Sequence, residues 1–246
     1  MGTFFKTVTS PFGYMAGPMA EGGALNIALI CLAFIVVILS AYLLGSINFA
    51  IVISKKKFKQ DIRTFGSKNA GMTNMMRTYG KTAAALTFVG DIAKAMVACI
   101  IGYLLIGQLG AFAAGLFCMI GHIYPIYYGF KGGKGVVTAA TTICMTDPPS
   151  FLILAILFVI IVAIWRYISL GSITCLALYP LVLSFTTKII AGQISPFIIF
   201  AVLMAVLIIA KHWTNIQRLR AGTESKFSFK KSVKPPKSES TDTDEK

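Results

Sequence analysis

The sequence predicts an all-α, polytopic membrane helix bundle of about seven transmembrane helices. Of its 246 residues, 56% are apolar and only 13% are charged, and the mean hydropathy is +0.77. Soluble domains carry about 25% charged residues, so a water-soluble globule of this size would have too few charges for its surface. The composition therefore excludes a soluble enzyme, a disordered chain and a fibrous or coiled-coil protein.

Seven apolar stretches support the helix count, each broken from the next by glycine, proline or charge. They cover residues 26–53, 82–107, 109–130, 134–146, 150–166, 168–190 and 194–211. The fourth stretch is short and Gly107-Gln108-Leu109-Gly110 is a minimal turn, so merging the weaker stretches leaves a five-span alternative. We expect one membrane-embedded domain over residues 26–220, an extracytoplasmic segment over residues 1–25 and a disordered cytoplasmic tail over residues 221–246.

The uneven distribution of basic residues predicts the orientation. The chain has 23 Lys and Arg against 9 Asp and Glu, a net charge of +14. Residues 54–81 hold eight Lys or Arg against Asp61 alone, whereas the N-terminal segment offers only Lys6, balanced by Glu21. By the positive-inside rule the first loop is cytoplasmic and the N-terminus is outside. With seven spans the later basic clusters and the C-terminus are also cytoplasmic.

The first of these loops carries more polar residues than orientation requires. Its candidate functional residues are Ser67, Asn69, Gly71, Thr73, Asn74 and Arg77. Small polar side chains and free backbone N–H groups suit an anionic ligand, and an arginine can donate to two phosphate oxygens. An ordinary polar loop of turn-forming residues is the alternative.

A glycine-rich loop after the third stretch favours phosphate binding as well. Its candidates are Lys131, Gly132, Gly133, Lys134 and Gly135. The glycines let the backbone approach a ligand, and the lysines supply point charges. The spacing is not that of a Walker A loop, so nucleotide hydrolysis is not implied. The alternative is a turn with lysines that only set orientation.

The segment after the last stretch places His212 and Asn215 on one helical face. An imidazole can act as a base or as a hydrogen-bond donor, whereas an amphipathic interfacial helix is the alternative. Asp91 and Lys94 form an ionisable pair one helical turn apart inside the second stretch. The sequence supports a functional role and a purely structural role for this pair equally.

The sequence predicts no metal, disulfide or cofactor. All five cysteines lie in apolar runs, without a CxxC pair or a histidine at metal-ligand spacing. Nucleic-acid binding is not expected, because the aromatic residues lie mostly in apolar runs rather than between the basic residues.

Several ordered motifs resemble those of one family. They are Gly45-Ser46-Ile47, GSxNxGxTNxxR from Gly66 to Arg77, GHxxP from Gly121, FKGGKGV from Phe130, RYxSL from Arg166 and HxxNIxRLxxGxE from His212 to Glu224. From about Tyr42 to Glu224 the chain resembles the bacterial acyl-phosphate:glycerol-3-phosphate acyltransferases, called PlsY.

The resemblance implies transfer of a fatty acyl group from acyl-phosphate to the 1-hydroxyl of glycerol 3-phosphate. The products would be lysophosphatidic acid and phosphate, in the first step of phospholipid synthesis. It further implies a seven-helix protein of the bacterial cell membrane, in contact with membrane lipids, with a cytoplasmic active site and without direct use of acyl-CoA or acyl carrier protein. A transporter of phosphorylated solutes or lipids is the alternative, although it predicts polar residues at both membrane faces.

The resemblance also implies roles for residues. The expected catalytic residues are Ser67, Asn74, Arg77, His212 and Asn215; the expected substrate-binding residues are Ser46, Asn69, Gly71, Thr73, Lys131, Gly132, Gly133, Lys134, Gly135 and Ser169; Glu224 is expected to be structural. The base is either His212 or a phosphate oxygen of the donor, and either Lys131 or Lys134 binds the acceptor phosphate. The chain departs from the usual family residues at Asn48, Lys68, Met72 and Lys211.

Overall fold

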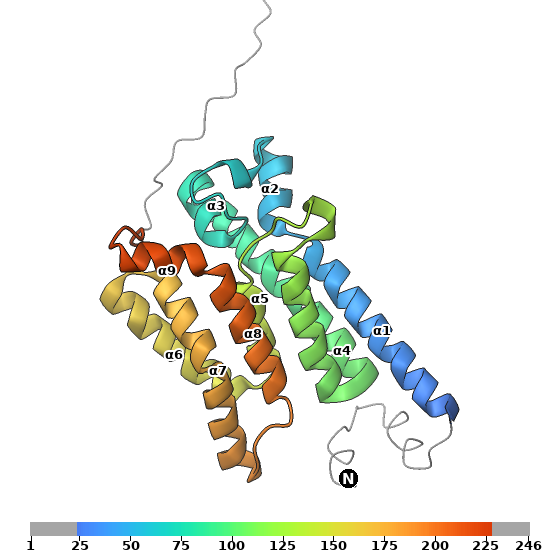
Figure 1. The fold of residues 1–246 in the computed structure, drawn as a ribbon. Coiled ribbons are helices and arrows are strands. Elements are labelled where there is room, and N and C mark those ends of the chain that lie inside the picture. Colours follow the sequence, from blue (N-terminus) through green and yellow to red (C-terminus); the bar gives the residue numbers. More distant parts are fainter. Residues whose placement is uncertain (1–23, 228–246) are drawn as a thin grey trace, which may run out of the picture.

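A computed structural model of the chain describes residues 24–227, and within this range all regular structure is helical (Figure 1). The α-helices are α1 (Ala24–Ser46), α2 (Phe49–Phe58), α3 (Met72–Tyr79), α4 (Lys81–Ile123), α5 (Val136–Thr146), α6 (Pro148–Trp165), α7 (Ile168–Ala191), α8 (Ile198–Lys211) and α9 (Trp213–Arg220). Residues 1–23 and 228–246 lie outside the described range, and with them most of the two predicted terminal segments.

The helices are apolar enough for a membrane, as the sequence predicts. Four candidate spans, Ile27–Phe58, Lys81–Tyr128, Pro148–Trp165 and Ile168–Ala191, are long enough to cross, and α8 with α9 makes a fifth if this pair, bent by 58°, is one span. At 11 residues α5 is shorter than a span. The all-helical class is thus confirmed for the described residues, and the apolar helices agree with a membrane protein. The count of seven and the orientation stay predictions.

The longest helix, α4, folds back on itself at Gly107. This residue has φ 67° and ψ −149°, which no α-helix contains. Beyond the break the two arms run antiparallel, because Lys94 contacts His122 at 2.9 Å and Gly102 lies against Gly110. The two stretches expected on either side of the Gly107–Gly110 turn are therefore separate arms of one hairpin.

The first predicted stretch, residues 26–53, is interrupted rather than continuous. Helix α1 ends at Ser46, and Asn48 adopts an extended conformation in which its side chain accepts a hydrogen bond from the Ile51 N–H (3.2 Å) and caps α2. Asparagine favours this position because it satisfies a helix N–H that has no partner inside the helix. The break separates α1 from α2, whose last turn carries three of the lysines.

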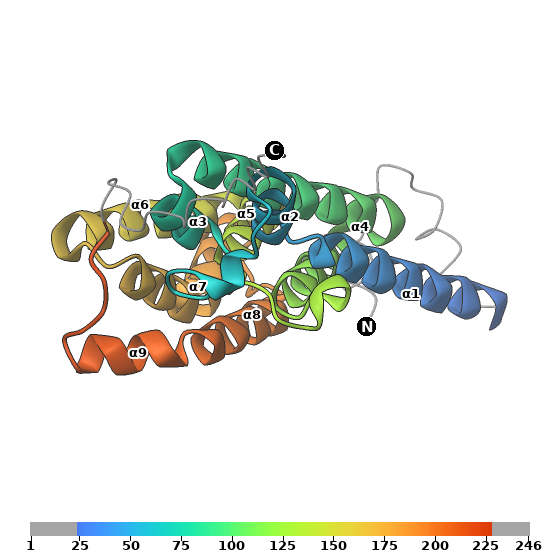
Figure 2. The same cartoon turned by 90° about the horizontal axis from the view of Figure 1, so that it is seen from above.

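Small residues bring α1 close to α4. A Cβ on Gly45 would lie 2.1 Å from the Cys118 carbonyl oxygen, and a Cβ on Gly121 would lie 2.2 Å from that of Tyr42. Such close contacts are typical of membrane helices, whose association depends on van der Waals packing. Seen from above, α1 lies at one end of the molecule and α6 and α9 lie at the other (Figure 2).

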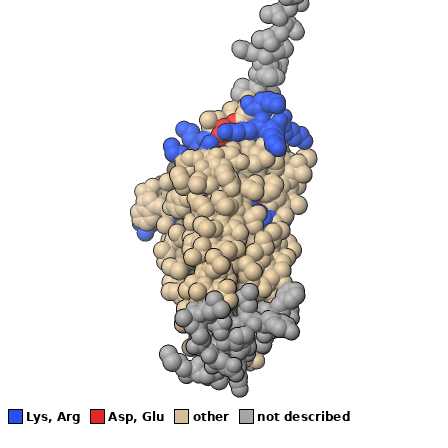
Figure 3. Space-filling view, turned by 90° about the vertical axis from the view of Figure 1, so that its right-hand side faces the viewer, with Lys and Arg blue, Asp and Glu red and all other residues tan. Residues whose placement is uncertain are grey.

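The second half of the chain forms its own apolar core. Helices α6, α7 and α8 pack with the second arm of α4 and with α5 around Phe112, Met119, Tyr179, Leu183 and Met204, which are buried. Large apolar side chains such as Leu32, Val159 and Leu181 are instead exposed on the outer surface, as expected of residues that face lipid. On the face shown in Figure 3, Lys and Arg gather at one end, above a broad surface with few charged atoms.

The contact between the two arms of α4 predicts that Gly110→Val destabilises the fold. A Cβ on Gly110 would lie 2.0 Å from the backbone oxygen of Gly102, so the arms must separate, at a cost of about 1–3 kcal/mol. The apparent unfolding midpoint in detergent should fall measurably. The control is Ala85→Val on the exposed side of the same helix, and equal midpoints for the two variants would contradict the hairpin packing.

Candidate active site

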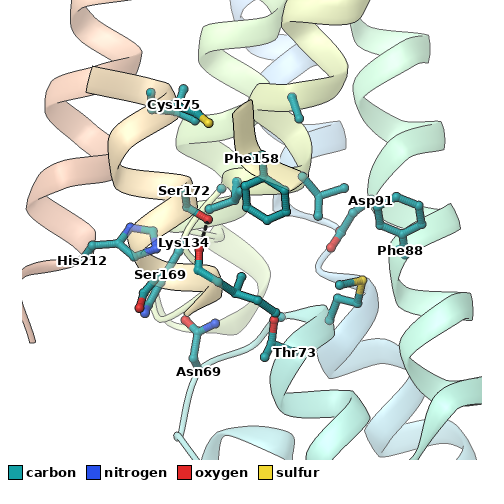
Figure 4. Close-up of a pocket in the computed structure, with 18 of the residues that line it drawn as sticks. Asn69, Thr73, Phe88, Asp91, Lys134, Phe158, Ser169, Ser172, Cys175 and His212 are labelled. Atoms are coloured by element: carbon teal, nitrogen blue, oxygen red, sulfur yellow. Dashed lines mark hydrogen bonds between the residues drawn. The ribbon is translucent and has the colours of Figure 1, made fainter. Parts of the chain in front are cut away.

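A cavity of about 940 Å³ opens where α3, α4, α5, α6, α7 and α9 converge (Figure 4). Twelve of the sixteen site residues expected from the sequence line it: Ser67, Asn69, Gly71, Thr73, Asn74, Arg77, Lys134, Gly135, Ser169, His212, Asn215 and Glu224. Residues from four separate parts of the sequence therefore meet at one place.

The loop of residues 66–71 is shaped by the amide of Asn74, which is buried. Its Oδ1 accepts the Ser67 N–H at 2.9 Å, and its Nδ2 donates to the carbonyls of Phe65 (2.9 Å) and Asn69 (3.1 Å). Gly66 has φ 55°, and a Cβ there would lie 2.3 Å from Asn74 Oδ1. Since these loop contacts occupy its amide, Asn74 lies at the site as a positioning residue.

Two helices begin at the cavity without a side-chain cap. Helix α3 follows Gly71 and helix α5 follows Gly135, and neither residue caps its helix through a side chain. The first residues of both helices line the cavity. N–H groups at a helix start lack intrahelical partners and carry partial positive charge. Both ends are consequently suited to bind phosphate groups.

Two cationic side chains add to these helix ends. Arg77 lies on α3, and Lys134 precedes Gly135 and donates a hydrogen bond to Asn215 Oδ1. Burial lowers the pKa of Lys134 to about 8, although the carboxylate of Glu224 partly offsets this effect. Lys134 is thus a cation near neutral pH that loses its proton only slightly above it.

The bend between α8 and α9 places His212 at the cavity, where its side chain is buried. Its Nδ1 lies 2.8 Å from the carbonyl oxygen of Ile208. A carbonyl only accepts hydrogen bonds, so this ring nitrogen carries the proton and the neutral ring has its lone pair on Nε2. Figure 4 shows His212 on the same side of the cavity as Lys134 and Ser169.

Glu224 connects three segments at the rim of the cavity. Its carboxylate accepts hydrogen bonds from Ser169 Oγ (2.7 Å), Asn215 Nδ2 (2.6 Å) and Arg218 Nε (2.7 Å). Burial opposes ionisation, yet these donors hold the pKa of Glu224 below its usual value. The segment after α9 is therefore held against the starts of α7 and α9, and residues 225–227 line the cavity with it.

Four expected site residues do not line the cavity. Ser46 is buried and donates to the Tyr42 carbonyl (2.8 Å). The backbone N–H groups of Gly132 and Gly133 bond to carbonyls at the end of α4, at 3.2 and 3.1 Å. Lys131 is exposed, and Arg63 binds its carbonyl oxygen at 2.9 Å. Because these contacts hold the first half of the glycine loop against α4, only Lys134 and Gly135 reach the cavity.

The cavity also has lining residues that were not expected from the sequence. Ser172 lies one helical turn beyond Ser169, so a helical-face argument finds it. Thr141 lies nearly two turns beyond Gly135. Phe88, Met96 and Phe158 line its apolar part, and no pattern distinguishes them from lipid-facing residues. Among residues 24–227 no group of three His, Cys, Asp or Glu lies close enough to hold a metal ion.

The fold and the site together define an α-helical membrane protein with a cavity suited to phosphorylated ligands. The family model "Glycerol-3-phosphate acyltransferase" matches residues 35–222, and the chain belongs to this family. Membership favours the acyltransferase hypothesis over the transporter hypothesis.

Individual relatives agree with the family assignment. A glycerol-3-phosphate acyltransferase of Syntrophomonas wolfei is 43% identical over 77% of this chain and 94% of its own length. That of Coxiella burnetii is 40% identical over 80% of this chain and its whole length. The crystal structure of PlsY (YgiH), an integral membrane glycerol 3-phosphate acyltransferase in its glycerol 3-phosphate form, has a TM-score of 0.72. It is 36% identical over 79% of this chain and 96% of that one.

The lowered pKa of Lys134 predicts that the cavity loses affinity for phosphate in mild alkali. Below pH 8 the side chain is a cation, and above pH 8 it becomes neutral. The Kd for inorganic phosphate should thus rise up to about tenfold per pH unit between pH 8 and pH 9.5, where the phosphate itself stays dianionic.

Calorimetry on the purified protein measures this dependence, and Lys134→Arg is the control. Arginine stays protonated throughout this range, so the alkaline rise in Kd should disappear even if the affinity at pH 7 is lower. An unchanged alkaline rise in the variant would assign the titration to another group.

Proposed function

We propose that this protein transfers a fatty acyl group from acyl-phosphate to the 1-hydroxyl of glycerol 3-phosphate, and so forms lysophosphatidic acid and phosphate. One observation carries the proposal: a single cavity joins two uncapped helix starts, Arg77 and Lys134 to an apolar region. The names of the family and of its relatives support the acceptor. A second PlsY structure, with a TM-score of 0.69 and 34% identity, is a lysophosphatidic acid form and supports the product.

The presence of two phosphate-binding elements favours acyl-phosphate as the donor. Acceptor and donor would each carry a phosphate, and two dianions brought together repel each other. The starts of α3 and α5, with Arg77 and Lys134, supply positive potential for both. A thioester of coenzyme A or of acyl carrier protein has no phosphate at the reacting carbonyl and would leave one of these elements without a partner.

The apolar region of the cavity suits the acyl chain. Phe88 and Met96 on α4 and Val159 on α6 line the cavity, yet these residues are 41, 39 and 64% exposed. Helix α5 packs against both α4 and α6. The cavity therefore reaches the lipid-facing surface between these helices, where a fatty acyl chain can enter from the bilayer.

In the proposed reaction the acceptor hydroxyl oxygen attacks the carbonyl carbon of the acyl-phosphate. The new C–O ester bond forms as the C–O bond to phosphate breaks, and the phosphate leaves with the electron pair. The hydroxyl proton passes first to a base and finally to the released phosphate. Arg77, Lys134 and the backbone N–H groups stabilise the charge on the carbonyl oxygen and on the leaving group.

Two groups can take the hydroxyl proton. His212 Nε2 has a free lone pair, since Nδ1 donates to the Ile208 carbonyl. A phosphate oxygen of the donor is the other base, in which case the protein contributes mainly by positioning. The two mechanisms share every other contact and differ in what the removal of His212 does to kcat.

We further propose seven spans in a bacterial cell membrane, with the cavity on the cytoplasmic side. The cavity lies at the end of the molecule that carries α2, α3 and α9, and the last turns of α2 and α9 are rich in Lys and Arg. Basic loops stay on the cytoplasmic side of membranes, where glycerol 3-phosphate would reach the site from water.

The assay that tests the function uses purified protein with acyl-phosphate and glycerol 3-phosphate. It should release lysophosphatidic acid and phosphate in equal amounts. Lys134→Ala should lower kcat/KM at least about 100-fold, as the loss of a group that stabilises developing charge does. The matched control is Lys131→Ala, which should retain activity within about threefold because Lys131 does not line the cavity. Equal rates with acyl-CoA, or equal losses in the two variants, would contradict the proposal.

The variant His212→Ala separates the two bases. If His212 takes the proton, kcat should fall by about 100-fold or more, with little change in the KM for glycerol 3-phosphate. If the donor phosphate takes it, His212 only orients the hydroxyl and the main effect should be on KM. Wild-type kcat and KM together would show that His212 has neither role.

A further inference from the structure

A buried cluster of three ionisable residues, Asp91, Lys94 and His122, lies inside the α4 hairpin and takes no part in the proposed reaction. Lys94 Nζ lies 2.9 Å from Asp91 Oδ1 and 2.9 Å from His122 Nδ1, and the exposed fractions of the three side chains are 2, 2 and 5%. Asp91 and His122 also line the cavity, and Figure 4 shows the Asp91 side chain on the side opposite His212.

Stability alone does not explain this cluster. Removing charges from water costs several kcal/mol per ion, and well-packed apolar residues in place of a buried ion pair are often equally stable or more stable. Asp91 and Lys94 lie among apolar residues in the first arm of α4, so an apolar pair would suit the helix. The contacts of the cluster with other segments therefore indicate what it does.

Lys94 holds the break between α1 and α2. Its Nζ donates to the carbonyl oxygens of Gly45 (3.0 Å) and Ile47 (2.9 Å). These carbonyls belong to the end of α1, where intrahelical partners run out. An ammonium group has three donors, which here match the two backbone oxygens and His122 Nδ1, while the Asp91 carboxylate lies beside the ammonium as an ion pair. The position of Asn48, the next residue, is thereby fixed relative to α4.

Asn48 extends this connection to the loop of residues 66–71. Its Nδ2 donates to the carbonyl oxygen of Ala70 at 3.2 Å, and its side chain is fully buried. A Cβ on Gly133 would lie 2.6 Å from the same Ala70 oxygen and 2.1 Å from His122 Nε2. Gly133 is thus enclosed between the Ala70 carbonyl and the His122 ring, and its N–H donates to the His122 carbonyl (3.1 Å).

These contacts form a closed circuit. It runs from Lys94 through the α1–α2 break and Asn48 to Ala70, then through Gly133 to His122 and back to Lys94. The circuit joins the loop that precedes α3 to the glycine loop that precedes α5. It thereby determines how far the two uncapped helix starts lie from each other, and Lys134 directly follows Gly133.

We propose that Lys94 is a positioning residue that sets the spacing of the two phosphate-binding helix starts through Asn48 and His122. Asp91 neutralises its charge in the apolar bundle. This inference rests on the proposed binding of glycerol 3-phosphate at the cavity, and it does not depend on the identity of the acyl donor.

The test compares Lys94→Met with the double variant Asp91→Asn/Lys94→Met in purified, detergent-solubilised protein. The single variant leaves a carboxylate buried without its partner and should lower the unfolding midpoint strongly. The double variant removes both charges and should recover most of that loss. Its Kd for glycerol 3-phosphate, measured by calorimetry, should still be at least about tenfold above wild type, with a larger change in KM than in kcat.

Two further variants sharpen the result. Asn48→Ala breaks the circuit without altering a charge and should raise the Kd in the same direction. Thr87→Val is the control, since Thr87 is buried on the same helix and its hydroxyl donates to the Ala83 carbonyl one turn earlier in that helix; the Kd of this variant should match wild type. Wild-type affinity in the double variant or in Asn48→Ala, or weakened binding in Thr87→Val, would overturn the positioning role.

The measurements also separate this inference from the proposed reaction. If wild-type protein binds glycerol 3-phosphate but turns over no acyl-phosphate, the donor assignment fails and the Kd comparison still decides the role of Lys94. If wild-type protein does not bind glycerol 3-phosphate, both are overturned.

Discussion

The cost of placing charge inside an apolar bundle governs the organisation of this protein. A charged group away from water must be paired or hydrogen-bonded, since isolated burial costs many kcal/mol. Lys94 has three hydrogen-bond partners and one ion-pair partner within 3.0 Å, and Glu224 accepts from three donors. The cavity follows the same constraint. Its cations, Arg77 and Lys134, lie near the starts of α3 and α5, where the backbone N–H groups can also help to neutralise a bound anion.

Under this constraint, a helix start supplies positive potential without a full charge. An uncapped N-terminus attracts phosphate without adding a full charge that would need a partner in the empty site. This explains why glycine stands before both α3 and α5, where a capping side chain would occupy the same N–H groups. Lys134 does add a full charge, and burial makes this charge costly when no anion is bound, which lowers the pKa of Lys134 to about 8.

Much of the fold and most of the site could be predicted from the sequence, for identifiable physical reasons. Apolar length and glycine breaks predicted the helices and the turn at Gly107, since both depend on local composition. The break at Asn48 was missed, because the apolar run resumes directly after it, from Phe49 to Ile53. Phe88 and Phe158 line the cavity but could not be distinguished in the sequence from lipid-facing residues, because only tertiary packing decides which apolar residues face a ligand rather than lipid.

The glycine loop shows how one motif can combine two tasks that its sequence does not separate. Lys131 and Lys134 are equivalent as charges, and Gly132, Gly133 and Gly135 are equivalent as flexible residues. In the fold, the half with Gly132 and Gly133 is bonded to the end of α4, so that Lys134 and Gly135 reach the cavity. A substitution at Gly133 would therefore disturb a contact with His122 and Ala70, whereas one at Gly135 would alter the helix start itself. Only one half of the loop reaches the cavity, because the other half is bonded to α4.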